Sequence, residues 1–190
     1  MGHKFDVAKR RKLDSEERRR ILPPKDTLLK VGLQERDTMA DIGCGIGYFT
    51  FPVSEIVGPK GALSAMDISP EMLADVDQKV IEKGISNIKT VKTEENDCKL
   101  NSESVTYGFI STVLHEAKDA GSFLIETKRI LAEQGKIAII EWQKAETGYG
   151  PPVDHRLDIE DVKQMLVDHN FQNIQGMDIG EHFYVVLAQK

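Results

Sequence analysis

The segment with the clearest chemical meaning is Asp41-Ile42-Gly43-Cys44-Gly45-Ile46-Gly47. Its three glycines at alternate positions permit a sharp turn, and without Cβ atoms they let the backbone close on a ligand. A helix that begins near Gly47 would point its free amide groups and its positive end into the same space. The segment therefore predicts a ligand-binding turn between a strand and a helix.

The spacing of these glycines distinguishes two classes of ligand. Dinucleotide-binding turns read G-x-G-x-x-G and place a pyrophosphate on the helix N-terminus. Here the pattern is G-x-G-x-G, and Asp41 precedes the first glycine by two positions. A carboxylate in the cleft repels a pyrophosphate but attracts an ammonium group. The combination favours a zwitterionic amino acid that carries adenosine, namely S-adenosylmethionine.

Further polar residues follow the next two expected strands. Asp67 ends the second strand, where a carboxylate can accept hydrogen bonds from both hydroxyls of a ribose. Ile68 and Met72 are candidates for covering the adenine faces, with core packing as the equal alternative. In Thr93-Glu94-Glu95-Asn96-Asp97, Glu94 is the preferred acceptor for the adenine amino hydrogens, with a solvated surface acid as the alternative.

Two groups that could act on an acceptor follow the fourth expected strand. His115 titrates near neutral pH, so it could deprotonate an acceptor or hydrogen-bond to it. The alternative is a histidine that holds the loop at the start of a helix. Glu116 carries the same two interpretations. His115 and Glu116 are therefore the candidate catalytic residues.

Three later residues are candidates for lining an acceptor pocket. Trp142, the only tryptophan, follows the fifth strand and either walls the pocket or packs in the core. His155 and Arg156 follow a stiff Gly-Pro-Pro turn and are candidates for binding an anionic acceptor. The five histidines and two cysteines show no metal-ligand spacing, so we predict no metal site.

Alternating strand-like and helix-like patterns position these residues. Expected strands cover 38–42, 62–66, 88–91, 107–111 and 136–141, and the last two strands cover 174–177 and 183–188. Expected helices cover 48–57, 70–83 after the cap residue Ser69, 118–133, and a segment capped by Asp158. Strands separated by helices imply βαβ units and a mainly parallel sheet covered on both faces, closed by an antiparallel hairpin. Ligands bind such sheets at the carboxyl ends of the strands.

Length and composition limit the class of protein. The 190 residues, 40% hydrophobic and 29% charged, are typical of one globular domain. Apolar runs are too short to span a bilayer, and the start lacks an apolar signal-peptide core, so we expect a cytoplasmic protein without an integral membrane segment. The net charge of −6 argues against a nucleic-acid partner.

The charge is unevenly distributed along the chain. Residues 1–20 hold eight Lys or Arg against four acids, on an otherwise acidic chain. This basic segment is either a solvated helix face or a cover for an anionic ligand. We divide the single domain into a helical lid segment, 1–30, and a core, 31–190. Our hypothesis is that Phe5 and the helix from Ser15 fold over the cleft, with Phe5 in the substrate pocket.

The glycine-rich segment, Met66-Asp67-Ile68-Ser69, and Arg129-Ile130-Leu131 with Gly135-Lys136 resemble class I S-adenosylmethionine-dependent methyltransferases over roughly residues 36–190. Within that class the chain is similar to the ubiquinone/menaquinone-biosynthesis-like branch. The segments that support this branch are Leu114-His115-Glu116, Ile140-Glu141-Trp142 and Gly150-Pro151-Pro152.

The resemblance implies an α/β fold, a Rossmann-like doubly wound sheet of seven mostly parallel strands with a C-terminal antiparallel hairpin. It also implies a set of cofactor contacts. These are Asp41, Gly43, Gly45, Asp67 and Glu94, with backbone contributions from Ile68 and Glu95, and with Ser111 and Thr112 flanking the methionine end.

We therefore expect a transferase that moves a methyl group from S-adenosylmethionine to a small-molecule acceptor in an SN2 step and leaves S-adenosylhomocysteine. The donor is already activated, so the protein mainly aligns the reactants and excludes water, with a general base needed only for some acceptors. One alternative is a nicotinamide-dependent oxidoreductase, which the glycine spacing and the antiparallel tail count against. Another is a catalytically silent cofactor-binding protein that acts through partners. The sequence leaves open the acceptor and a homodimer.

Overall fold

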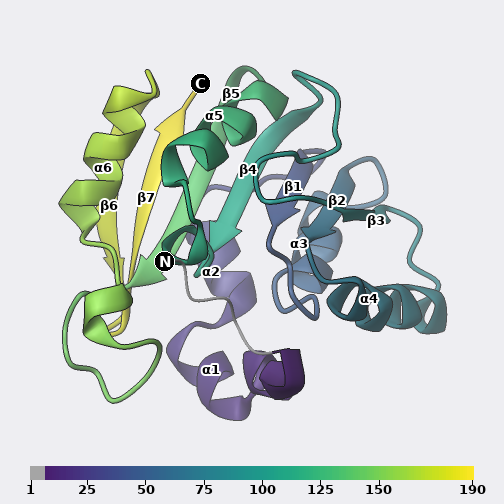
Figure 1. Ribbon diagram of the computed structural model, residues 1–190. Coiled ribbons are helices and arrows are strands. Elements are labelled where there is room, and N and C mark those ends of the chain that lie inside the picture. Colours follow the sequence, from purple (N-terminus) through teal and green to yellow (C-terminus); the bar gives the residue numbers. More distant parts are fainter. Residues whose placement is uncertain (1–6) are drawn as a thin grey trace.

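The computed structural model describes residues 7–190, so the predicted role of Phe5 lies outside the described residues. Seven strands form one sheet in the order β3-β2-β1-β4-β5-β7-β6 (Figure 1). The first five are mutually parallel, and β7 pairs antiparallel with both β5 and β6. This confirms the predicted fold class. The strands are β1 (Thr38–Ile42), β2 (Ala62–Asp67), β3 (Ile88–Lys92), β4 (Val105–Ser111), β5 (Leu131–Trp142), β6 (Gln172–Ile179) and β7 (Phe183–Gln189).

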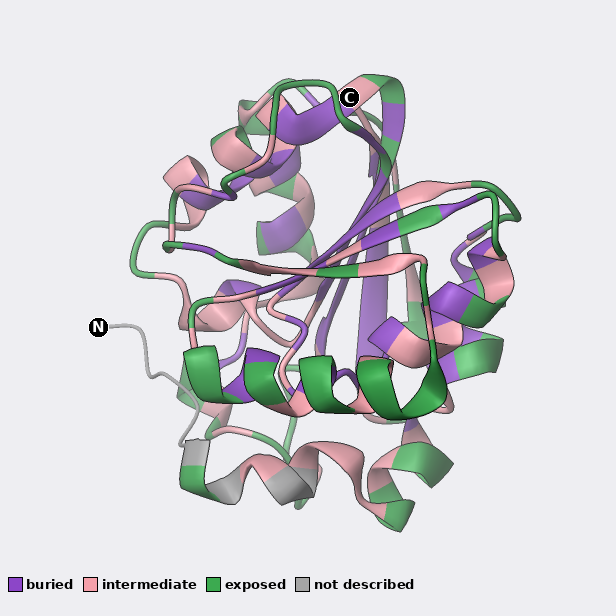
Figure 2. Ribbon diagram, turned by 90° about the vertical axis from the view of Figure 1, so that its right-hand side faces the viewer, coloured by how far each residue is buried: buried purple, intermediate pink, exposed green. Residues whose placement is uncertain are grey.

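Helices cover both faces of the sheet, and their apolar sides are buried against it while their outer sides are exposed (Figure 2). Helices α2, α3 and α4 pack on one face, and α5 and α6 pack on the other. The helices are η1 (Val7–Asp14), α1 (Glu16–Ile21), α2 (Pro24–Lys30), α3 (Thr50–Val57), α4 (Pro70–Lys83), η2 (Leu114–Glu116), α5 (Ala120–Ile130), η3 (Val153–His155) and α6 (Ile159–Asp168).

Side-chain caps begin α4 and α6, the two helices for which the sequence predicted a cap residue. The Ser69 hydroxyl accepts a hydrogen bond from the Met72 amide, as predicted, and Gly84 ends α4 in the left-handed region. Asp158 caps α6 by accepting from the Glu160 amide, also as predicted.

Two predicted helix boundaries are wrong. The helix expected over 118–133 ends at Ile130, because Leu131 pairs with Val105 of β4 and the residues before Lys136 form an irregularity in β5, with Gln134 at a φ of +60°. A Cβ on Gly135 would lie 2.9 Å from the Ala132 carbonyl oxygen, so this irregularity is tight. Leu131 therefore starts β5, and its pairing makes both strands longer than expected. The helix expected from residue 48 begins at Thr50, because the glycine-rich turn extends to Phe49.

The strand register brings the candidate residues to one edge of the sheet. Ile42 pairs with Met66 on one side and with Ile110 on the other, and Ser111 pairs with Ile140. The segments that follow β1, β2, β4 and β5 therefore leave the sheet at the same edge. In Figure 1 this edge is at the bottom, where η1 and α1 also lie.

Candidate functional site

The glycine-rich turn is tied to the end of β2. The amides of Gly43 and Cys44 both donate to the Met66 carbonyl oxygen, at 2.8 and 2.9 Å. Gly43 has a φ of +78°, and a Cβ there would lie 2.4 Å from Cγ2 of Val113. This position therefore requires glycine for both its backbone conformation and its close contact with the loop after β4.

Asp41 is buried beneath this turn, with 3% of its surface exposed. The Thr50 hydroxyl donates to its carboxylate at 2.7 Å. Burial raises the pKa of Asp41 to about 7, with a smaller contribution from the charge of Asp67 and against the lowering effect of the Thr50 bond. In the part of the chain that the structure describes, no cation forms an ion pair with Asp41. A positively charged ligand at the turn would supply one and favour the ionised form.

Asp67 lies at the end of β2 beside the turn. Its two carboxylate oxygens accept hydrogen bonds from the amides of Gly45 (2.9 Å) and Ser69 (2.8 Å). Burial raises its pKa, and these amide bonds oppose the effect. A carboxylate offers about four acceptor positions, so two ribose hydroxyls could still bind.

The two apolar residues after Asp67 have different environments. Ile68 is 41% exposed, whereas Met72 is 4% exposed and belongs to the buried side of α4. Ile68 thus offers an accessible apolar surface next to Asp67. Met72 fits the alternative interpretation, packing in the core.

The loop after β3 reaches the same edge. The Thr93 amide donates to the Asp67 carbonyl oxygen, and Glu94 and Asp97 close a short turn through their backbones. The Glu94 carboxylate is exposed and forms an ion pair with Lys99 at 3.1 Å. Glu95 accepts a hydrogen bond from the Lys118 amide, which connects this loop to the start of α5.

The described part of the N-terminal segment lies across the turn. A Cβ on Gly45 would lie 3.2 Å from Cδ1 of Leu13, and the Arg10 guanidinium bonds to Asp75 of α4 at 2.6 Å. Ser15 caps α1, because its hydroxyl accepts a hydrogen bond from the Arg18 amide. Figure 2 shows this segment below α4, outside the sheet.

Arg18 reaches the same edge of the sheet, and the sequence did not single it out. Its guanidinium lies 4.9 Å from the centre of the Tyr48 ring, and its Nη2 donates to the Thr112 hydroxyl at 3.4 Å. Burial lowers its pKa. Its Nε and the hydroxyl of Ser111 are buried without a hydrogen-bond partner. Arg18 belongs to a run of basic residues, and nothing in that run distinguishes the one that turns inward.

His115 and Glu141 form a buried pair at the ends of β4 and β5. Nδ1 of His115 lies 2.7 Å from Oε2 of Glu141, and the two side chains are 7% and 1% exposed. Burial alone would lower the pKa of His115, but the hydrogen bond and charge of Glu141 and the charge of Glu116 raise it overall. Nε2 of His115 lies 4.0 Å from Glu116. The sequence signal for Glu141 was an acid within an apolar strand.

Trp142 and Arg156 pack against each other beside β7. The Trp142 ring lies 4.2 Å from that of Phe183, and the Arg156 guanidinium lies 5.6 Å from the Trp142 ring. Arg156 is 5% exposed and donates to backbone oxygens of the loop after β5. Those oxygens belong to Gln143, Ala145, Tyr149 and Pro151. Its donors are committed to this loop, so the structure gives no support to its predicted role in binding an anionic acceptor.

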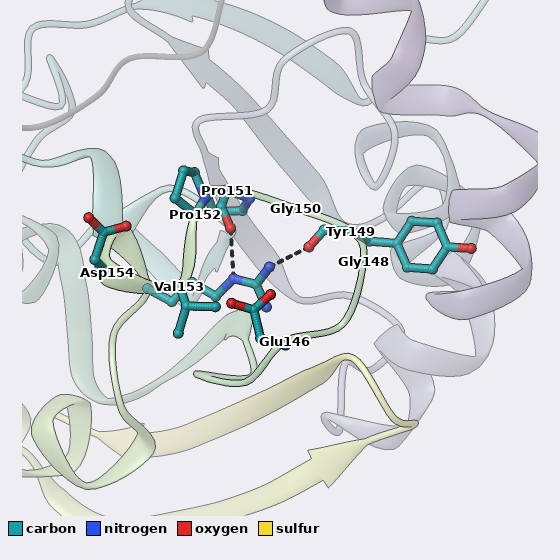
Figure 3. Close-up of a pocket in the computed structure, with 9 residues that line it drawn as sticks. Glu146, Gly148, Tyr149, Gly150, Pro151, Pro152, Val153 and Asp154 are labelled. Carbon is teal, nitrogen blue, oxygen red and sulfur yellow. Dashed lines mark hydrogen bonds between the residues drawn. The ribbon is translucent and has the colours of Figure 1, made fainter.

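A hollow of about 590 Å³ lies within this loop and not over the glycine-rich turn (Figure 3). Its lining comes from Glu146, Gly148–Asp154 and Arg156. The Tyr149 side chain extends from the hollow toward the N-terminal helices, and its hydrogen bond to Glu17 raises its pKa. His155 is exposed at the end of η3. The loop thus contacts α1 through Tyr149.

No group of three or more His, Cys, Asp or Glu is arranged to hold a metal ion in residues 7–190. In the same range, no helix has both the length and the apolar character needed to cross a bilayer.

Comparison with known proteins adds independent information. The sequence model of the ubiE/COQ5 methyltransferase family matches residues 24–150. A demethylmenaquinone methyltransferase of Geobacillus sp. (strain WCH70) is 27% identical over 124 residues, which cover 65% of this chain and 53% of that protein. The chain thus spans about half the length of the curated relatives it matches.

Solved structures match over nearly the whole chain. A crystal structure of a SAM dependent methyltransferase from Aquifex aeolicus is 32% identical, with a TM-score of 0.93, over 98% of this chain and 99% of that one. The [4+2]-cyclase SpnF matches 87% of this chain and 80% of its own, with a TM-score of 0.75, at 14% identity. The second match concerns the fold alone, because one fold serves different reactions.

Proposed function

The chain belongs to the ubiE/COQ5 methyltransferase family, and from that membership we propose that it transfers a methyl group from S-adenosylmethionine to a small-molecule acceptor. The observation that carries the proposal is the buried carboxylate of Asp41 under the glycine-rich turn. It has no cationic partner among the described residues, and a ligand with an ammonium group and a sulfonium supplies the missing positive charge. A nicotinamide cofactor presents a pyrophosphate to the same turn, so this feature also argues against the oxidoreductase alternative.

The residues around the turn have the chemical groups that the parts of the donor require. Asp67 would accept hydrogen bonds from the ribose hydroxyls, and Ile68 would cover one face of the adenine with its exposed side chain. Once released from its ion pair with Lys99, the Glu94 carboxylate would accept a hydrogen bond from the adenine amino group. The Glu95 backbone amide would donate a hydrogen bond to a nitrogen of the adenine ring. When bound, the donor supplies a methyl group on a positively charged sulfur.

We assign proton removal from the acceptor to His115. Its bond to the buried Glu141 holds the proton on Nδ1 and leaves Nε2 as the acceptor atom. Glu141 is then a positioning residue, because it fixes the ring and its tautomer without contacting the acceptor. Glu116 lies on the Nε2 side of the ring, where it would orient the acceptor. Trp142 is shielded by Gly150 and Phe183, so its packing role is the better supported one.

We also propose that the segment up to residue 30 is a lid over the donor. The contacts of Leu13 with Gly45 and of Arg10 with Asp75 support this role. Deletion of residues 1–20 removes these contacts but retains Leu22 and Leu28, which are fully buried in the core. We therefore expect weaker donor binding with cooperative unfolding retained. Unchanged donor affinity in the truncated protein would contradict the lid.

The decisive experiment is methyl transfer from isotope-labelled S-adenosylmethionine. Demethylmenaquinone, reduced to its quinol, is the first acceptor to test, because the curated relatives carry its name. A metabolite extract is the second. Label in a product supports the proposal, whereas donor binding without any transfer favours the catalytically silent alternative. Stabilisation by NAD instead of the methyl donor would refute the assignment of the cleft.

Cellular location follows from a different observation. Cys44 and Cys98 are both buried and unpaired. Free buried thiols are typical of reducing compartments, so we propose that the protein works in the cytoplasm. Disulfide-linked or oxidised protein in freshly lysed cells would contradict this location.

A further inference from the structure

Arg18 is a partly buried cation that forms no ion pair with any of the described residues. Asp14 is close enough to affect its pKa, but the Asp14 carboxylate forms its ion pair with Arg19, at 2.6 Å. Nε of Arg18 is buried and has no hydrogen-bond partner. A buried charge without a counter-charge is costly, and an unmade hydrogen bond adds to the cost. The arrangement therefore indicates that an anion belongs at this position.

Packing holds the Arg18 guanidinium in place. Its central carbon lies over the Tyr48 ring, and the Tyr48 hydroxyl is itself fixed by donating to the Leu22 carbonyl oxygen at 2.7 Å. The Ser15 cap fixes the backbone at Arg18. A guanidinium immobilised in this way loses little further freedom when it binds an anion, which favours tight binding.

A second unpartnered donor lies at the same edge. Nη2 of Arg18 reaches the hydroxyl of Thr112, and the neighbouring Ser111 hydroxyl is buried without a partner. Ser111 ends β4 and Thr112 follows it, next to β1, since Ile110 pairs with Ile42 directly before the glycine-rich turn. The free Nε–H and the free hydroxyl are therefore both beside the proposed donor site. Two such donors suit a carboxylate, which has two oxygens to accept them.

We propose that Arg18 and Ser111 form the binding site for the carboxylate of the donor's methionine end. This inference rests on the proposed function, which places the donor at this edge. The site then has opposite charges for the two charges of an amino acid, with Asp41 for the ammonium group and Arg18 for the carboxylate. It also gives the N-terminal segment a specific contact with the ligand in addition to covering it.

The test compares two ligands that differ in the amino-acid end. S-adenosylhomocysteine carries the carboxylate, whereas 5′-methylthioadenosine lacks the whole amino-acid group. Their dissociation constants are measured by calorimetry for the unmodified protein, Arg18→Met, Arg18→Lys and the control Arg20→Met, which changes an exposed arginine on the same helix. We expect Arg18→Met to weaken S-adenosylhomocysteine binding about 10- to 100-fold, which is the typical effect of losing a charge-assisted hydrogen bond. The affinity of Arg18→Lys for S-adenosylhomocysteine should lie between those of the unmodified protein and Arg18→Met. The affinity of each variant for 5′-methylthioadenosine should stay within about twofold of the unmodified protein's affinity.

Ligand-free protein supplies a check on folding. Because Arg18→Met removes a partly buried charge that has no ion-pair partner, its unfolding temperature should equal or exceed that of the unmodified protein. An equal loss of affinity for both ligands would overturn the proposal and assign Arg18 a purely structural role. Unchanged S-adenosylhomocysteine binding with a raised KM for the acceptor would also overturn it, in favour of an anionic acceptor. If the unmodified protein bound neither ligand, the proposed function itself would fail.

Discussion

Replacing Asp41 by Asn should change how the stability of the ligand-free protein depends on pH. The pKa of Asp41 is raised from 3.8 to about 7, so ionising this residue in the folded protein costs about 4 kcal/mol at about 1.36 kcal/mol per unit. Because the folded pKa lies above the unfolded one, the cost appears as pH rises from about 4 to about 7 and is complete above that range. Asn has the same shape, still accepts from the Thr50 hydroxyl and never ionises.

The assay is urea unfolding of both proteins at pH 4.5 and pH 8, without ligand. The linkage relation gives an ionisation cost of about 1 kcal/mol at the lower pH and about 4 kcal/mol at the higher one. The stability of Asp41→Asn relative to the unmodified protein should therefore improve by about 3 kcal/mol between them. The buried amide of Asn adds a penalty of about 1 to 3 kcal/mol, but this penalty is the same at both pH values. A relative stability that stays constant with pH would refute the account of Asp41.

Two other substitutions test the glycine-rich turn and the His115 pair. Gly43→Ala should lower the free energy of unfolding by more than about 2 kcal/mol, whereas Gly84→Ala, at a similar φ but with open space around it, should cost about 1 kcal/mol in the same urea assay. Equal costs would show that the contact with the loop after β4 is unimportant. Glu141→Gln removes the charge that raises the pKa of His115, so the acidic limb of the pH–rate profile should move to lower pH and kcat should fall. A profile that keeps its position would rule out His115 as the base.

Local sequence chemistry was sufficient for the turn and its acids. The glycines, Asp67 and the Ser69 cap lie within one strand-turn-helix unit or at the next strand end, where their relation depends on short-range geometry. The mainly parallel sheet followed from the alternating strands and helices, and its antiparallel end followed from the tight final hairpin. The end of α5 could not be predicted in this way, because residues 131–133 suit a helix but Leu131 pairs instead with Val105 of β4.

The contacts of the N-terminal segment depend on tertiary packing. Arg18 and Thr112 are 94 positions apart in the sequence, and their contact depends on how helix α1 packs against the edge of the sheet. Arg156 shows the opposite case, since its sequence context suggested a ligand contact but its donors bind the loop that precedes it. Any arginine side chain can donate to an anion or to backbone carbonyl oxygens, so residue type alone does not separate Arg18 from Arg156. Only the fold distinguished which one retains an unused donor.

The direction of β7 has a practical consequence for measuring binding. Because β7 runs antiparallel to β5, the chain returns to the opposite edge of the sheet, and the Lys190 amide donates to the Gly135 carbonyl oxygen there (Figure 1). An affinity tag or surface linkage added after Lys190 would emerge far from the glycine-rich turn. A tag fused ahead of the N-terminal segment would instead join the part of the chain that crosses that turn. Immobilisation through the C-terminal side is therefore the orientation that leaves ligand access undisturbed.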